Sequence, residues 1–237
     1  MPDASHNSDT PPRSNAARWF GRLQLLQLLG KSERTMAWRV AEPRRGQEWM
    51  LVLPRQPPND AEALEHWQQA TRRAARLNHP QLATMVETGV QDGWPFVAYD
   101  LHDSATLVER LTLQGLPGAD AATLAVQLLL GLAYAHEAGM AHHDPQPYLV
   151  LVSDGGQVRL AGLEVAAATS TPGWSGPRPA AQSPAALRLH RAAAERDVLA
   201  TGVLLHGMLT GASALAEPDT GRVIARLPPL GREIVRL

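Results

Sequence analysis

Two stretches, GLAYAHEAGMAHHDPQP at 131–147 and RDVLATGVLLHGMLTG at 196–211, decide the fold of this chain. The first joins the end of an apolar helix, predicted over 121–138, to a polar loop, and Gly139 stands where such a helix would stop. The second predicts a buried helix that ends at Gly211. Together they indicate that the chain after residue 101 is mainly helical.

The region before residue 101 is rich in strands. Asn59, followed by Glu62, is a capping-box pattern that predicts the start of a helix. Asp92-Gly93 predicts a tight hairpin turn. The helix has one apolar face, formed by Leu64, Trp67, Ala70, Ala74 and Leu77. The expected strands are 22–30, 35–41, 47–53, 82–90 and 94–100, with a later hairpin formed by 148–153 and 157–162.

Composition excludes several classes of function. The chain has 237 residues, a formal net charge of -1 and no cysteine. Disulfides and cysteine-based zinc sites are therefore excluded, and nothing in the charge favours nucleic acid. No uninterrupted apolar run reaches the ~18 residues of a membrane span. Residues 1–18 are polar, without the apolar core of a secretory signal, so we expect a flexible tail and a cytoplasmic protein.

Several motifs resemble the bacterial serine/threonine protein kinase family. LNHP at 77–80 is similar to the end of its C-helix, and PFVAYDL at 95–101 to the strand that enters the hinge. The two stretches that decide the fold resemble its catalytic loop and its F-helix. The resemblance implies an α+β, two-lobed fold. Its parts would be a disordered tail (1–18), a β-rich lobe with one helix (19–101), and a helical lobe that is incomplete at its C-terminus (102–237).

The resemblance also shows which phosphate-binding groups are missing. In the glycine-rich loop, GKSERT at 30–35, only Gly30 remains, and the chain's single lysine, Lys31, lies within this loop. The strand WMLVL at 49–53 supplies no lysine in any register, although Arg55 follows it. The paired glutamate of the family falls at about Ala70. A kinase needs this lysine to hold the phosphates of ATP.

The catalytic loop keeps some residues of the family pattern and loses others. His142 is expected to be structural, and Asp144 is at the position of the general base, here vestigial. Gln146 replaces a lysine, while Leu149 and Gly162 stand where the family has its metal ligands. Glu164 and the adjacent pair His142-His143 are weak metal candidates, so we expect no metal site. The retained core residues are His142, Pro147, Asp197 and Gly202.

The nucleotide cleft is expected to be degenerate. Gly30, Asp100 and Leu101 would line it. Apolar side chains such as Met50, Leu53 and Leu163 would close it. Binding of ATP would be weak, and binding of Mg²⁺ is not expected.

Three functions remain open. The first is a pseudokinase, a regulatory or scaffolding signalling module. The second is an unconventional active kinase that uses Asp144, with Arg55 or Lys31 as phosphate anchor. The third is a nucleotide sensor without turnover. The expected partner is a protein or a fused downstream domain, and the chain also loosely resembles N-terminal modules of HDOD-type signalling proteins. Neither nucleic acid nor membrane is an expected partner.

Overall fold

The structure is a computed structural model that describes residues 18–44, 46–163, 165 and 183–211. Its first part is a curled six-stranded sheet in the order β1-β2-β3-β4-β6-β5, with every neighbouring pair antiparallel. The strands are β1 (Arg18–Phe20), β2 (Leu23–Lys31), β3 (Thr35–Glu42), β4 (Gln47–Pro54), β5 (Met85–Gln91) and β6 (Trp94–Asp100). Five of the six were expected from sequence. The short β1 begins inside the segment that we expected to be a tail.

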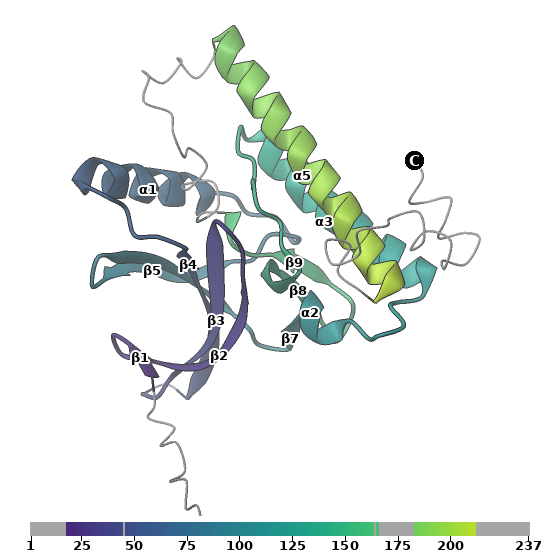
Figure 1. Ribbon diagram of the computed structural model, residues 1–237, viewed down its shortest axis with the longest axis horizontal. Helices are drawn as coiled ribbons and strands as arrows, with labels where there is room; N and C mark the ends of the chain where they lie inside the picture. Colours follow the sequence, from purple (N-terminus) through teal and green to yellow (C-terminus); the bar gives the residue numbers. More distant parts are fainter. Residues whose placement is uncertain (1–17, 45, 164, 166–182, 212–237) are drawn as a thin grey trace, which may run out of the picture.

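Helix α1 (Ala61–Ala74) lies across one face of this sheet (Figure 1). Its N-cap is Asp60, whose side chain accepts a hydrogen bond from the backbone N–H of Ala63 at 2.7 Å. The prediction of an Asn59–Glu62 capping box was therefore wrong by one residue. Asp60 has the extended backbone that an N-cap needs, and aspartate caps as well as asparagine.

The second part of the molecule is built around two long helices, α3 (Gly118–Glu137) and α5 (Pro184–Thr210), which lie side by side (Figure 1). Leu116, just before α3, donates its N–H to the carbonyl of Met208 in α5 at 2.6 Å. A small sheet, β7 (Ser104–Thr106), β8 (Val150–Ser153) and β9 (Val158–Leu160), packs below them. The short helices α2 (Leu107–Arg110) and η1 (Pro147–Leu149) complete this lobe.

Helix α5 differs from the expected buried helix over 196–210. It begins earlier, at Pro184, because the Ser183 side chain caps it by accepting the N–H of Ala186 at 3.1 Å. It ends at Gly211, as predicted, in the left-handed conformation. One side of it is exposed, with Leu199 70% and Val198 52% accessible, so the helix is only half-buried.

Three apolar clusters hold the chain together. One lies in the helical lobe around Leu128, Leu132 and Met208. Another covers the outer face of the large sheet around Trp49 and Phe96. The third joins the lobes, because it contains residues of β2, β4, β6 and α1 together with residues of η1 and β8. The space between the lobes is thus part of the core.

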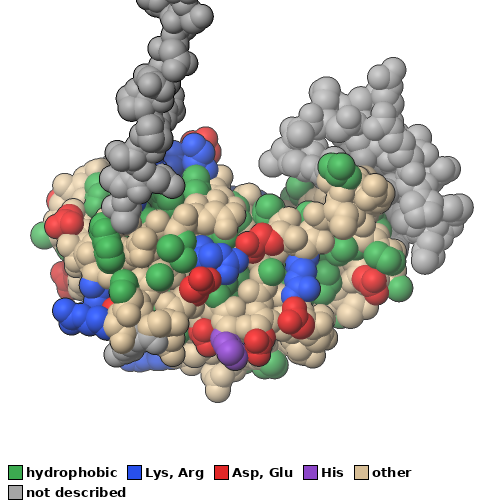
Figure 2. Space-filling view, turned by 90° about the horizontal axis from the view of Figure 1, so that it is seen from below, with side chains coloured by type: hydrophobic (Ala, Val, Ile, Leu, Met, Phe, Trp, Pro, Cys, Tyr) green, Lys and Arg blue, Asp and Glu red, His purple; other side chains and the backbone are tan. Residues whose placement is uncertain are grey.

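Neither the surface charge nor the apolar segments point to a particular kind of partner. Figure 2 shows acidic and basic side chains interspersed with apolar ones over one face, without a large patch of one sign. Among the described residues, α3 alone is long and apolar enough, by length and composition, to cross a membrane. Its buried side, which includes Ala121, Leu128 and Leu132, packs into the core of the helical lobe.

Candidate functional site: the loop between the lobes

The loop 142–149 is anchored by one fully buried carboxylate, Asp197 of α5. Its Oδ2 accepts the backbone N–H of His142 at 2.7 Å, and its Oδ1 accepts that of His143 at 2.8 Å. The imidazole Nε2 of His136 in α3 lies 2.8 Å from Oδ2 and donates a third hydrogen bond, since a carboxylate can only accept. Burial alone would raise the pKa of Asp197, but these bonds outweigh it and lower the pKa.

The two histidines of the loop are fixed by the backbone. His142 is fully buried; its Nε2 donates to the carbonyl of Ala161 at 3.0 Å, and its Nδ1 accepts the N–H of Asp144 at 3.3 Å. Both ring nitrogens are used, which leaves no lone pair for a metal. His143 has a positive φ of 68°. Burial lowers the pKa of its imidazole to about 4, so the ring is neutral at pH 7.

Asp144 is surrounded by hydrogen-bond donors of the chain itself. Its Oδ2 accepts from Ser32 Oγ at 2.5 Å and from Thr35 Oγ1 at 3.0 Å. Its Oδ1 accepts from Gln146 Nε2 at 2.8 Å. Ser32 and Thr35 come from the hairpin between β2 and β3, so this carboxylate connects the two lobes. Asp144 is only 8% exposed.

Tyr148 fills the space below the same hairpin. Its hydroxyl lies 2.9 Å from Thr35 Oγ1, and its ring packs under the backbone of Gly30. A Cβ added at Gly30 would lie 2.2 Å from Cδ1 of Tyr148, so no larger residue fits there without movement. Gly30 is therefore required by a tyrosine ring of the chain. Burial raises the pKa of the Tyr148 phenol, which keeps it protonated and able to donate.

The two positions expected to carry metal ligands pack against each other. Leu149 is fully buried, and a Cβ added at Gly162 would lie 3.1 Å from Cδ1 of Leu149. Gly162 has a φ of 88°, which favours glycine, and its N–H donates to the hydroxyl of Tyr99 at 3.0 Å. Neither position supplies an oxygen ligand. Nowhere in the described residues do three or more His, Asp or Glu side chains gather as a metal site would require.

The expected position of the phosphate-binding lysine is apolar in the structure. Met50 and Val52 are fully buried and belong to the cluster between the lobes, together with Trp67 of α1. The buried face of α1 consists of Trp67, Thr71 and Ala74, while Ala70 is only partly buried. Lys31 and Arg55 are exposed. No lysine–glutamate pair therefore forms among the described residues in this part of the cleft.

Asp100 and Leu101, which were expected to line the nucleotide cleft, lie in different environments. Leu101 is buried in the cluster between the lobes. Asp100 is exposed, and its Oδ1 accepts the N–H of His102 at 2.9 Å. A surface cavity of about 550 Å³ lies beside them, lined also by Arg39 and Glu48. It opens beside the hinge, away from the hydrogen bonds of Asp144.

Comparisons with known proteins find similarity to bacterial serine/threonine kinases. No family model matches the chain. Over 170 residues it is 34% identical to the serine/threonine-protein kinase PknL of Mycobacterium tuberculosis, covering 68% of this chain and 42% of PknL. It is 23% identical over 201 residues to PrkC of Bacillus subtilis, covering 82% of this chain and 31% of PrkC. The chain thus spans about two fifths or less of the length of these relatives.

The solved kinase domain of M. tuberculosis PknI has the same fold, with a TM-score of 0.56 and 20% identity, over 93% of this chain and 96% of that one. This chain is a protein-kinase-like domain. Its first lobe is the curled sheet with α1, and its second lobe is the helical part. The predicted α+β two-lobed fold is confirmed.

The kinase-like domain brings together only part of the predicted site. Asp144 donates its backbone N–H to His142, and Gly30 lies in the hairpin whose Ser32 and Thr35 bind the Asp144 carboxylate. The expectation that Leu53 and Leu163 close the cleft was wrong: Leu53 faces the outer cluster, because side chains alternate along β4, and Leu163 belongs to the core of the helical lobe. Met50 does lie between the lobes.

Sequence reasoning missed the side chains that fill the cleft of the kinase-like domain. Tyr148 and Leu151 are both buried there, and Ser32 and Thr35 close it with hydrogen bonds. The signal was present: two hydroxyl residues replace loop glycines, and an aromatic residue follows the polar loop. Gly202 was expected to organise the core, yet it is exposed, and an added Cβ would meet nothing within 4 Å.

Some predictions concern segments outside the described residues. Glu164 lies there. The Ala, Ser, Thr, Pro and Gly content of 166–184 predicts a loop, and most of that segment, including the candidate phosphate acceptors of 169–172, also lies outside the described residues. Ser183-Pro184-Ala185, which loosely matches another motif of the kinase family, forms the capped start of α5.

Proposed function

We propose that this kinase-like domain is catalytically impaired and acts as a regulatory or scaffolding signalling module. One observation carries the proposal: the positions that would bind phosphate and metal hold apolar side chains packed against one another. Leu149 and Gly162 occupy the metal positions and pack against each other, and the strand 49–53 places Met50 and Val52, not a lysine, between the lobes. The curated relatives are named as serine/threonine kinases, so the impairment is a proposal about this chain alone.

The missing groups have a large expected effect on rate. Phosphoryl transfer depends on positioning and on positive charge around the transferred group. Each loss of ~1.4 kcal/mol of charge stabilisation lowers the rate tenfold, and two metal ligands together supply several times that amount. The residues at these positions fit neither a nucleotide phosphate nor Mg²⁺, so these positions offer no group that could hold the phosphates or the metal during transfer.

The retained parts support a structural task. The anchoring of the loop by Asp197 is complete, and the lobes share one apolar core. A rigid two-lobed surface of this kind suits the binding of a protein partner or of a fused output domain in the cytoplasm. The looser link to HDOD-type proteins remains part of this proposal.

The test is a thermal-shift titration of the purified domain with ATP and ADP, each with and without Mg²⁺. We expect no shift at millimolar nucleotide. A phosphotransfer assay on a serine/threonine peptide runs alongside, comparing the natural chain with Asp144→Asn and with the exposed control Asp154→Asn. A Mg²⁺-dependent shift, with phosphate incorporation that only Asp144→Asn abolishes, would contradict the proposal. A shift that is independent of Mg²⁺ would favour the nucleotide sensor.

A further inference from the structure

Hydrogen bonds join the β2–β3 hairpin to the loop 142–149, and the donor and the acceptor of each bond can be assigned. The hydroxyls of Ser32 and Thr35 both point to Oδ2 of Asp144, which can only accept. Thr35 Oγ1 gives its single hydrogen to Asp144, so the contact with Tyr148 is a donation from the tyrosine hydroxyl. Ser32 Oγ in turn accepts the backbone N–H groups of Arg34 and Thr35, each at 3.0 Å. Every donor in the network therefore has an acceptor.

This network occupies the one chemical group that the kinase-like loop retains. Thr35 is fully buried, and Asp144 and Tyr148 are nearly so. Gln146 covers the other oxygen of the carboxylate. A ligand or a substrate hydroxyl can reach Asp144 only after Ser32 and Thr35 have left it.

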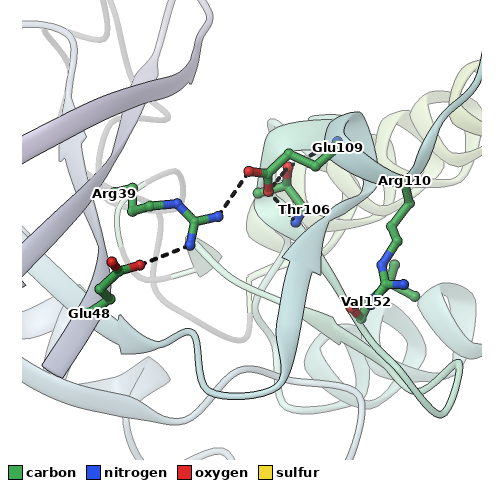
Figure 3. Close-up of polar contacts among 6 residues, drawn as sticks. All are labelled: Arg39, Glu48, Thr106, Glu109, Arg110 and Val152. Atoms are coloured by element: carbon green, nitrogen blue, oxygen red, sulfur yellow. Dashed lines mark hydrogen bonds and ion pairs between the residues drawn. The ribbon is translucent and has the colours of Figure 1, made fainter.

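A second polar contact joins the lobes farther along β3, at Arg39. Arg39 donates to Glu48 of β4 at 3.1 Å and to Glu109 of α2 at 2.9 Å (Figure 3). Glu109 is itself held by Thr106, through the N–H and the hydroxyl of that residue, both at 2.8 Å. Strand β3 is thus fastened to the helical lobe near Thr35 and again at Arg39.

We propose that Ser32, Thr35, Asp144 and Tyr148 form an autoinhibitory clasp, in which the hairpin's own hydroxyls take the place of any ligand at Asp144. The Arg39–Glu109 pair is its outer support. The clasp goes beyond the proposed function, because it would operate in an active or an inactive domain. Any ligand of the cleft binds only the unclasped fraction of molecules, so its apparent affinity is reduced by that fraction.

The test uses the double variant Ser32→Ala/Thr35→Val, which removes the two hydroxyl donors and little volume. Hydrogen exchange of the hairpin amides is measured by mass spectrometry. We expect peptides over 30–37 to exchange at least tenfold faster, while peptides of α3 stay unchanged. The matched control is Thr123→Val, since Thr123 donates its hydroxyl within α3 and is exposed.

A distance measurement checks the same opening without relying on exchange. The chain has no cysteine, so the pair Glu33→Cys and Glu137→Cys can be spin-labelled alone. Both residues are exposed, one on the hairpin and one at the end of α3. We expect one narrow distance distribution in the otherwise natural chain. The double variant should give a broader one that extends to longer distances.

Gly30→Ala tests the clasp from the packing side, because its Cβ would collide with the ring of Tyr148. It should open the hairpin as the double variant does. Unchanged exchange and unchanged distances in both variants, with the fold intact by circular dichroism, would overturn the clasp. None of these readouts uses nucleotide, so the clasp can fail while the proposed lack of phosphotransfer stands, and the reverse.

Discussion

The two sides of the loop 142–149 have opposite characters. The anchored side consists of His136, His142, His143 and Asp197, and there the Asp197 carboxylate accepts hydrogen bonds from the loop backbone. The filled side consists of Asp144, Tyr148, Leu149 and Gly162, and it faces the opposite lobe. On this side the chain's own side chains take the space that a nucleotide and a metal would need.

The difference shows that the shape of a catalytic loop and its chemistry are separable. The anchored side depends on a buried charge, which is costly to leave without partners. The filled side depends on close packing, which tolerates apolar replacements provided that volume is conserved. Substitutions on the two sides should therefore fail in different ways.

The largest effect is expected from Asp197→Ala. It leaves two buried backbone N–H groups and His136 without their acceptor. Loss of one partner of a buried charged network costs about 3–5 kcal/mol. Urea unfolding should show a decrease of this size, whereas Asp154→Ala, at an exposed site, should change the free energy of unfolding by under ~1 kcal/mol. A loss below ~1 kcal/mol in Asp197→Ala would mean that the loop is held by something else.

The next effect concerns the filled side. Leu149→Asn restores the amide of the family in a fully buried apolar site. We expect a loss of about 2–4 kcal/mol, because a polar group is buried without a partner and packing is lost. Binding of Mg²⁺–ATP should not appear in a thermal-shift assay. The control Leu149→Met should cost less than ~1.5 kcal/mol. Gain of Mg²⁺-dependent binding in Leu149→Asn would show that the filled side can still be opened to a metal.

The anchored side could be predicted from sequence, and the filled side only in outline. The resemblance to the kinase family marked Asp197 as a retained core residue, and in the structure its carboxylate accepts the backbone N–H groups of His142 and His143. The losses at Leu149 and Gly162 were also visible. Sequence did not show which side chains fill the space of the lost groups, because that depends on packing between segments that are distant in the chain. Tyr148 meets Gly30 across a long separation in sequence, and no local pattern encodes that contact.

Sequence also failed to predict which face of a strand or helix is buried. Leu53 was expected in the cleft, but a shift of one residue along β4 turns a side chain to the opposite face. The extent of α5 was missed for a related reason: its start depends on a cap at Ser183, and its exposed side depends on what lies beside it. Elements with a strong period and a glycine stop, such as α3, were predicted closely.

A smaller effect is expected from pH on the anchored side. The pKa of His143 is lowered to about 4 in the folded chain, against ~6.5 when unfolded. Between these values the unfolded state binds more protons, so stability rises with pH from about 4 to 6.5 and is lost as pH falls. Because the ring is partly exposed, we expect only about 1–2 kcal/mol over this range.

Urea unfolding at several pH values measures this slope. His143→Asn should flatten it, since asparagine does not titrate and tolerates the positive φ. The pKa of buried His206 is also lowered, by desolvation, so part of the slope should remain until that residue is replaced too. The lowered pKa of Asp197 acts below this window, where its protonation removes further stability. An unchanged slope in His143→Asn would show that the imidazole is not desolvated.

The smallest effect separates two glycines, Gly30 and Gly202, that both match the pattern of the kinase family. Gly30 is covered by Tyr148, but Gly202 lies in the middle of α5 with nothing within 4 Å of an added Cβ. Gly202→Ala should therefore stabilise the chain by about 0.5–1 kcal/mol, because alanine is the better helix former. The midpoint of thermal unfolding should rise by about 1–4 °C. The half-buried, helix-terminal Gly118→Ala, also with nothing within 4 Å of the added Cβ, serves as the comparison. A fall in the midpoint for Gly202→Ala alone would mean that another surface packs against this side of α5, which is where a partner of the helical lobe would then be sought.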